Sequence, residues 1–275
     1  MQANPKHRPG VERARSPGNP PEHPDSAAPG PDRTLSGVVV EGRAESLLGI
    51  ADSAGEGQVG AAELRRRPLL RPGEVLETVP GLIATQHSGA GKANQFFLRG
   101  FNLDHGTDLR TTVAGVPQNL PSHGHGQGYT DLGFLIPELI DRVSFRKGPY
   151  AARDGDFSAA GAVDIDYVRE LDRGIARITA GSYDFGRALV ADSVTALGGT
   201  LLFGAELQNN DGRWQVPEAF HKHNGVLRFS RGDERDGFDV TAMGYRADWT
   251  ATDQVPARAV AAGTLHRFGS LDPTS

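Results

Sequence analysis

Glycine is the residue that most constrains what this 275-residue chain can fold into. The sequence contains 36 glycines, roughly 13 % of the chain, against about 7 % in an average protein. Glycine weakens the interiors of helices and strands, and it adopts the backbone conformations that tight turns need. We therefore expect a turn-rich β architecture.

The composition excludes several classes of protein. The chain has no cysteine, which rules out disulfide scaffolds, cysteine-ligated metals, cysteine nucleophiles and a lipid-anchored N-terminal cysteine. A net charge of −5 gives no electrostatic reason to expect a nucleic-acid partner. No apolar run approaches the ~20 residues of a membrane-spanning helix. Membrane-spanning β-strands remain compatible with the sequence, because they alternate and register weakly in hydropathy.

The first quarter of the chain has little capacity to form a core. Residues 1–33 hold eight of the 18 prolines, and Met1 and Val11 are their only larger apolar side chains. We therefore predict a disordered tail over 1–33, and no signal peptide is visible at the start. Residues 34–70 are expected to be a linker that carries one strand-like segment, Ser36-Gly37-Val38-Val39-Val40-Glu41.

Residues 71–172 are expected to form a small mixed α/β domain. A helix is predicted from Pro72 to Val79, and a second, interrupted at Pro137, from the apolar stripe between Leu132 and Ile140. The predicted strands cover residues 95–99, 109–114, 141–147 and 162–168.

Four motifs in this domain resemble a known family. They are Pro72-Gly73-Glu74-Val75-Leu76-Glu77-Thr78-Val79-Pro80-Gly81, Phe97-Leu98-Arg99-Gly100-Phe101, Ile140-Asp141-Arg142-Val143 with Arg146-Lys147-Gly148-Pro149, and Gly161-Ala162-Val163. Their order and content resemble the plug domain of TonB-dependent outer-membrane receptors. The resemblance implies an α+β plug domain over 71–172, followed by antiparallel β-strands of a transmembrane β-barrel.

The last hundred residues agree with that expectation. Segments of about ten alternating residues, the length of outer-membrane strands, are separated by Gly, Asp and Asn. They cover residues 175–183, 185–193, 200–208, 226–230 and 238–249, with a possible sixth strand at 265–268. Residues 173–275 suffice for five or six strands, whereas a plugged transporter barrel has 22. We therefore expect an N-terminal piece of a receptor with a truncated barrel.

The resemblance also implies a function and its partners. It implies uptake of a metal complex, with iron–siderophore as the default substrate, across the outer membrane, without covalent chemistry or a resident cofactor. Energy would come from TonB, supplied by ExbB and ExbD, which pulls on a TonB box at Ser36–Glu41. Outer-membrane lipid would surround the barrel. Two alternatives stay open: a soluble periplasmic metal-binding plug module, and a non-functional remnant.

Histidines are the candidate substrate-binding residues. His87, His105, His123 and His125 lie in the predicted plug, with Tyr129 just beyond them. Neutral imidazole binds zinc, copper, nickel and iron. The motif His123-Gly124-His125 is therefore a candidate metal site, and a loop with solvated histidines is the alternative. Contacts between the plug and the barrel are expected from three cationic residues: Arg99, Arg146 and Lys147.

One motif suggests an enzyme and fails on inspection. Gly89-Ala90-Gly91-Lys92-Ala93 resembles a phosphate-binding loop. Gln86 stands where the first glycine belongs, and Ala93 replaces the Ser or Thr. We therefore do not expect an enzyme.

Overall fold

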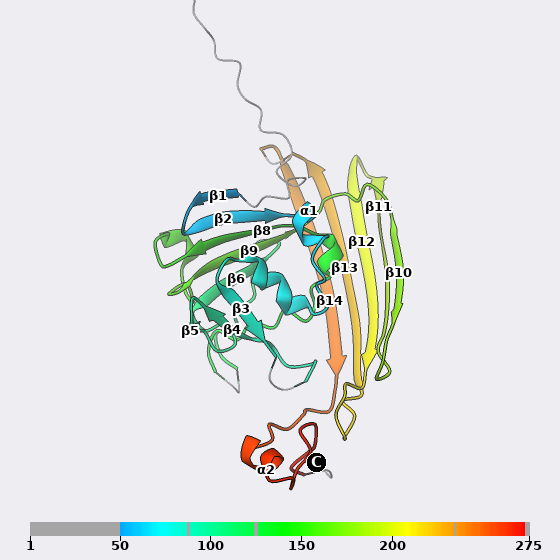
Figure 1. Ribbon diagram of the computed structural model, residues 1–275. Helices are drawn as coiled ribbons and strands as arrows, with labels where there is room; N and C mark the ends of the chain where they lie inside the picture. The colour runs from blue at the N-terminus through cyan, green and yellow to red at the C-terminus, as the bar shows by residue number, and fades with distance from the viewer. Residues whose placement is uncertain (1–49, 87–88, 124–125, 234, 273–275) are drawn as a thin grey trace, which may run out of the picture. The chain divides into compact units, whose positions relative to one another are not determined.

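The computed structural model describes residues 50–86, 89–123, 126–233 and 235–272, which belong to one compact unit. The predicted tail 1–33, the segment Ser36–Glu41, His87 and His125 lie outside the described residues. The N-terminal domain comprises residues 50–172, and the C-terminal sheet comprises the strands that follow it (Figure 1).

The N-terminal domain is built on a six-stranded sheet in the order β1-β2-β8-β9-β6-β7. Its strands are β1 (Ile50–Ser53), β2 (Glu56–Gly60), β6 (Leu109–Val113), β7 (Val116–Pro117), β8 (Ile140–Lys147) and β9 (Gly161–Tyr167). Only the β6–β9 pair is parallel. The pairing of β2 with β8 brings residues 50–60 into the domain, upstream of the predicted boundary at residue 71.

A smaller sheet and short helices complete this domain. The three-stranded sheet contains β3 (Leu82–Thr85), β4 (Gln95–Leu98) and β5 (Phe101–Asn102). The helices are α1 (Ala61–Leu64) and three 3₁₀ segments: η2 (Pro72–Thr78), η3 (Pro137–Leu139) and η4 (Ala152–Asp154). The helix predicted from Pro72 is present as η2, where the Glu74 side chain accepts the backbone N–H of Arg71.

The second predicted helix, over 132–140, was wrong. Its stripe residues Leu135, Ile136 and Leu139 are fully buried, but the chain there is a turn followed by η3. Ile136 precedes Pro137 and is extended (φ −106°, ψ 98°), because the proline ring disfavours the helical conformation in the residue before it. The apolar spacing therefore identified the core residues correctly but predicted the wrong backbone conformation.

The C-terminal sheet is an antiparallel meander of five strands. These are β10 (Ile175–Ala180), β11 (Gly186–Ala196), β12 (Gly199–Asn210), β13 (Phe220–Gly232) and β14 (Gly237–Asp248). Five of the predicted strands are thus confirmed. The possible sixth, at 265–268, is a turn, and it follows a short helix, α2 (Ala257–Ala261).

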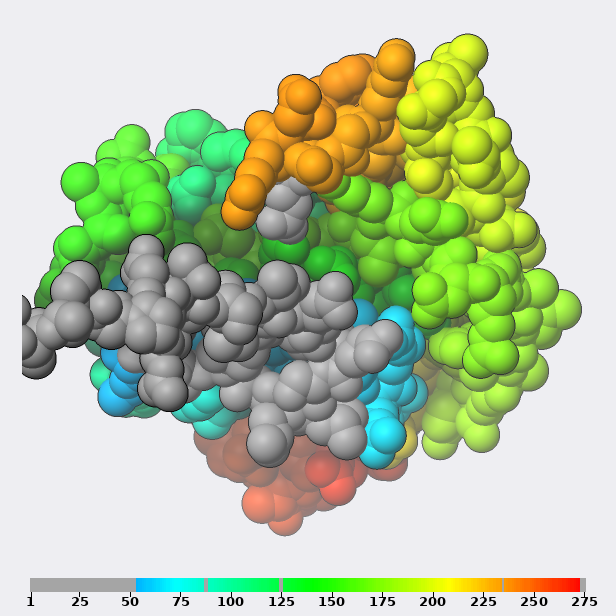
Figure 2. Space-filling view, turned by 90° about the horizontal axis from the view of Figure 1, so that it is seen from above, coloured from blue at the N-terminus to red at the C-terminus, as the bar shows by residue number. Residues whose placement is uncertain are grey.

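Alternate residues of this sheet face different surroundings. One face packs against the N-terminal domain and buries both apolar and charged side chains, among them Leu202 and Glu206. The other face exposes large apolar side chains: Val190, Val194, Phe203, Leu207, Leu227 and Val240. In the space-filling view, residues of the N-terminal domain lie against one side of these strands (Figure 2). Leu202 of β12 points to the first face and joins the core of the N-terminal domain.

We expect Leu76 of η2 to carry much of the stability of the N-terminal domain, because its side chain is fully buried. Leu76→Ala should lower the free energy of unfolding by about 2–5 kcal/mol. Ile83→Ala is the matched control, since Ile83 is 56 % exposed, and it should cost under about 1 kcal/mol. Urea unfolding of the full chain in detergent, followed by circular dichroism, measures both. Equal midpoints for the two variants would contradict the packing described.

Candidate functional site

The connections between the sheet strands are short at one end and long at the other. At the end we call the turn end, residues 197–198 and 233–236 link the strands. At the opposite end, the loop end, the links are residues 181–185 and 211–219, and the chain continues from Trp249 beyond β14. Outer-membrane β-proteins place short turns in the periplasm and long loops outside the cell.

Two segments of the N-terminal domain lie at the loop end. The Ala90 N–H donates to the Glu218 carboxylate in the 211–219 connection, at 3.1 and 3.3 Å. The Asn224 side-chain amide on β13 donates to the Phe134 carbonyl at 2.6 Å. The loop end of the sheet therefore faces residues near 90 and near 134.

Three of the predicted substrate-binding residues come together there. The His123 ring stacks on the Tyr129 ring with 4.1 Å between centroids, and the His105 ring lies 5.3 Å from the same ring. His105 is buried, and its Nδ1 lies 3.0 Å from the Asn94 carbonyl oxygen. The Tyr129 hydroxyl accepts the Ala93 N–H at 3.2 Å. We call these three side chains the histidine–tyrosine cluster.

The cluster is a mixed aromatic and polar surface. Burial raises the pKa of the Tyr129 hydroxyl, and the nearby Asp131 carboxylate adds to the shift. Tyr129 therefore stays protonated at neutral pH and can donate a hydrogen bond. Among the described residues, no group of three or more His, Cys, Asp or Glu side chains converges as a metal-ligand set. The metal site predicted at His123 and His125 stays a prediction, since His125 lies outside the described residues.

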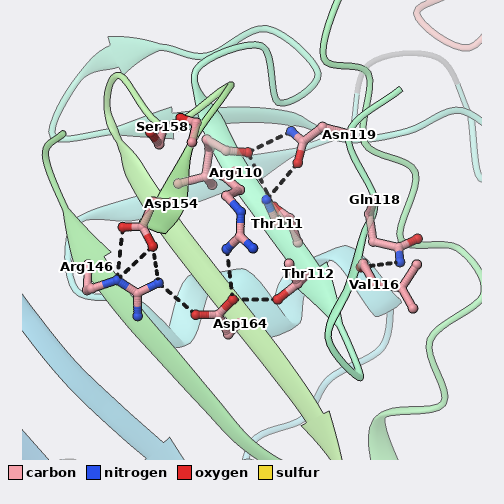
Figure 3. Close-up of polar contacts among 12 residues, drawn as sticks. Arg110, Thr111, Thr112, Val116, Gln118, Asn119, Arg146, Asp154, Ser158 and Asp164 are labelled. Atoms are coloured by element: carbon pink, nitrogen blue, oxygen red, sulfur yellow. Dashed lines mark hydrogen bonds and ion pairs between the residues drawn. The ribbon is translucent and has the colours of Figure 1, made fainter. Parts of the chain in front are cut away.

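The three cations predicted to contact the barrel have their described contacts within the N-terminal domain. Arg146 forms ion pairs with Asp154 at 2.6 Å and Asp164 at 2.8 Å (Figure 3). Arg99 donates to the Ala54 carbonyl at 3.4 Å, and the Lys147 ammonium lies 5.1 Å from the centre of the Phe145 ring.

Asp164 is the centre of the cluster that Arg146 joins. It also pairs with Arg110 and accepts the Thr112 hydroxyl, so that it ties β6, β8 and β9 together (Figure 3). Burial alone would raise the pKa of its carboxyl, but the hydrogen bonds and charges of Thr112, Arg146 and Arg110 lower it. This cluster stabilises the six-stranded sheet.

Other residues, which the sequence reasoning missed, join the domain to the sheet. Glu138 of η3 accepts two hydrogen bonds from Arg187 on β11, at 2.6 and 2.9 Å, and one from Arg177 on β10 at 2.7 Å. Arg187 also pairs with the buried Glu206 at 2.6 Å, and Lys222 of β13 pairs with Glu206 at 3.0 Å. We call Glu138, Arg187, Glu206 and Lys222 the interface network.

A second contact lies toward the turn end. Asp239 of β14 pairs with Arg169 of the N-terminal domain at 2.8 Å and with Arg228 of β13 at 3.1 Å. Arg228 also donates to the Tyr167 carbonyl. The polar alternate positions of the predicted strands were the sequence signal for these contacts, but their partners could not be assigned without the register.

We expect acid to weaken the interface network through Glu138. Burial raises the pKa of Glu138, but the hydrogen bond and charge of Arg187 outweigh it, and the net pKa is lowered. A lowered folded-state pKa gives stability that is present above the ordinary pKa and lost as the pH falls through the folded value. Glu138→Gln should lower the free energy of unfolding by about 1.5–3 kcal/mol at pH 7. The variant should also lose less stability than the parent chain as the pH falls below about 5.

Urea unfolding between pH 7 and pH 3 tests this expectation. Glu170→Gln is the control, because Glu170 is exposed, and it should follow the parent chain at every pH. If the parent chain and Glu138→Gln lose the same stability between pH 7 and pH 3, Glu138 is not the cause of the acid sensitivity.

Comparison with known proteins places these features in a family context. The family profile described as "TonB-dependent Receptor Plug Domain" matches residues 51–162. A ferric enterobactin receptor, PirA of Pseudomonas aeruginosa, is 32 % identical over 149 residues, which cover 50 % of this chain and 19 % of the relative. The chain therefore spans about a fifth of that relative.

Solved structures show the same fold. The ferric citrate transporter FecA in its unliganded form superposes with a TM-score of 0.60 at 17 % identity, over 80 % of this chain and 35 % of FecA. The copper transporter OprC gives 0.55 at 19 % identity, over 74 % of this chain and 32 % of OprC. The predicted fold class is confirmed: a plug domain precedes antiparallel strands like those of the barrels in these structures. None of the described helices combines the length and the apolar character that crossing a membrane requires.

Proposed function

We propose that this protein acts in uptake of a ferric siderophore or a related metal complex across the outer membrane, because residues 51–162 match the plug-domain profile of TonB-dependent receptors. The observation that carries the proposal is the position of the histidine–tyrosine cluster. It lies at the loop end of the sheet, on the end that faces outward in outer-membrane proteins. The names of the relatives, which include a ferric enterobactin receptor and a ferric citrate transporter, support this substrate class.

The two faces of the C-terminal sheet support a place in the outer membrane. Its outer face exposes Phe203, Leu207 and Leu227, which suits contact with lipid. Its inner face buries Glu206 and Lys222 against the plug domain. A soluble sheet would bury its apolar face and expose its charges, so the alternation here favours a lipid environment over a soluble periplasmic module.

Substrate contact is assigned to the histidine–tyrosine cluster, and His87 and His125 stay candidates from the sequence. An aromatic hydroxyl and imidazoles can donate hydrogen bonds to the anionic oxygens of a ferric chelate. Imidazole nitrogens can also contact a free metal ion, for which His123 and His125 are the candidates. Substrate binding here would act on the plug by contacts alone, without a covalent step.

Ferric enterobactin and ferric citrate are suitable binding probes, because relatives of this chain carry these names. We expect the full chain in detergent to bind at least one of them, with a signal from quenching of Trp214 and Trp249. Tyr129→Ala should weaken binding about ten-fold or more, as loss of a buried aromatic contact does. Glu170→Gln should bind like the parent chain.

A zinc titration distinguishes binding of a bare metal ion from binding of a ferric chelate. If imidazoles ligate a bare ion, His123→Ala/His125→Ala should lose zinc binding while Tyr129→Ala keeps it. Equal zinc binding by the parent chain and the double variant would end the metal-site proposal. Failure to bind either chelate would contradict the proposed substrate class.

Energy is assigned to TonB, with ExbB and ExbD as its supply, acting on Ser36–Glu41. The run Val38-Val39-Val40 suits an extended segment that adds a strand to a partner's sheet. Val39→Pro should abolish binding of the TonB C-terminal domain, because proline removes a backbone donor from such a pairing. Val39→Thr, which keeps β-branching, should bind within a few-fold of the parent chain. Isothermal titration measures both, and undiminished binding by Val39→Pro would exclude this segment as the TonB box.

A further inference from the structure

The motif that resembles a phosphate loop has a different role in the structure. The Ala90 N–H, in the middle of Gly89-Ala90-Gly91, points at both oxygens of Glu218, at 3.1 and 3.3 Å. A loop that presents its N–H to a carboxylate has already filled the position that a phosphate oxygen would take. The two residues are 128 positions apart, so this contact joins the plug domain to the 211–219 connection.

Glu218 is fixed from several directions. Its side chain is only 2 % exposed, and the Trp214 Nε1–H donates to its Oε1 at 2.8 Å. Its backbone N–H donates to the Asp211 carbonyl at 3.0 Å, and its own carbonyl accepts the Thr250 N–H at 2.7 Å. A single residue therefore ties the 211–219 connection to the segment that follows β14.

The two glycines are required by the close approach of these loops. A Cβ on Gly89 would lie 2.0 Å from Glu218 Oε1, and the Gly89 backbone has a positive φ of +76°. A Cβ on Gly91 would lie 2.0 Å from Cδ2 of Trp249. The glycine spacing therefore allows the loop to fit between Glu218 and Trp249.

The same short segment contacts the histidine–tyrosine cluster on its other side. Three residues after Ala90, the buried Ala93 donates its N–H to the Tyr129 hydroxyl at 3.2 Å. The next residue, Asn94, places its carbonyl 3.0 Å from His105 Nδ1. Residues 89–94 therefore form one strap with Glu218 at one end and the histidine–tyrosine cluster at the other.

We propose that Glu218 is a positioning residue that fixes this strap, so that the 211–219 connection and the histidine–tyrosine cluster move together. Displacement of the connection by an arriving substrate then reaches Tyr129 and His105 through residues 89–94. This inference rests on the proposed function only in treating the cluster as the substrate surface.

Hydrogen bonds hold the Glu218 carboxylate in its buried position. The donors that touch its carboxylate are the neutral N–H groups of Ala90 and Trp214, and burial raises the pKa of the carboxyl despite them. A raised pKa means that the ionised group is less favoured in this position than in water. The hydrogen bonds from Ala90 and Trp214, with the charge of Arg71, offset part of that cost and keep Glu218 in contact with the strap.

Amide hydrogen exchange of the full chain in detergent, without substrate, tests the proposal. In Glu218→Ala, the Ala90 amide should exchange about ten-fold faster or more, as expected for a lost hydrogen bond to a charged acceptor. The Ala93 amide should exchange about three-fold faster or more, because the strap transmits the loss. Glu218→Gln keeps an acceptor of the same shape and should restore both amides to within about three-fold of the parent chain.

Coupling must also run in the reverse direction. Tyr129→Phe removes the acceptor of the Ala93 N–H, and linkage requires that it also speeds exchange at Ala90. Trp214→Phe keeps an aromatic side chain but removes the N–H donor to Glu218, so it should speed exchange at both amides. These two variants decide the question if Glu218→Ala does not fold. Glu170→Gln is the exposed control and should change neither amide.

Two results would overturn the proposal. One is an unchanged Ala93 amide when the Ala90 amide is released, which would make the contact local. The other is failure of Glu218→Gln to restore protection, which would make the effect of Glu218→Ala a general loss of packing. Chelate binding is measured separately, so loss of the proposed substrate leaves this test intact.

Discussion

The plug domain and the C-terminal sheet are held together by charges that neither could bury alone. Glu206 and Lys222 lie on strands whose neighbours expose apolar side chains on the other face. Glu206 pairs with both Arg187 and Lys222 of the same sheet, which leaves these three residues with one positive charge in excess. A buried unpaired charge costs several kcal/mol, so this face requires an anionic partner. Glu138 provides it by pairing with Arg187, which in turn pairs with Glu206. The inner face of the sheet and the surface of the plug domain are therefore two halves of one polar interface.

The charged residues therefore form two groups: ion pairs within the plug domain and ion pairs between the plug domain and the C-terminal sheet. Arg146, Asp154 and Asp164 satisfy one another inside the plug domain, and they hold its sheet independently of the strands that follow. Glu138 and Arg169 face the C-terminal sheet and find their partners there. A domain that keeps its own ion pairs can shift relative to its surroundings without unfolding, because only the interface pairs have to break.

The sequence predicted the elements of the fold better than the contacts between them. Alternation located β11 to β14, and glycine and proline located the ends of β4, β6 and β8, because these signals are local. The apolar stripe at 132–140 identified core residues but gave the wrong backbone, since Pro137 overrides helical spacing. The partners of Glu138 and Ala90 lie 49 and 128 residues away. Such pairs depend on strand register, which no local pattern encodes, and so Arg99, Arg146 and Lys147 were favoured over Glu138.

The carboxylates of Glu138 and Glu218 differ in the partners that stabilise their ionised forms. Glu138 accepts its hydrogen bonds from arginines, and the guanidinium charges lower its pKa. The ionised form is therefore the favoured one, and the contact is strongest at neutral pH. Glu218 accepts the neutral N–H groups of Ala90 and Trp214 in a buried position, and burial raises its pKa although these donors and the Arg71 charge lower it. Burial of its ionised form costs free energy, so the stability contributed by this group falls as the pH rises through its folded-state pKa. At neutral pH the ionised carboxylate of Glu218 is therefore less favoured in its buried position than in water. The ionised carboxylate of Glu138 is more favoured in its position than in water. The Glu138 contact therefore depends on charge pairing, whereas the Glu218 contact depends on the hydrogen bonds that fix its position.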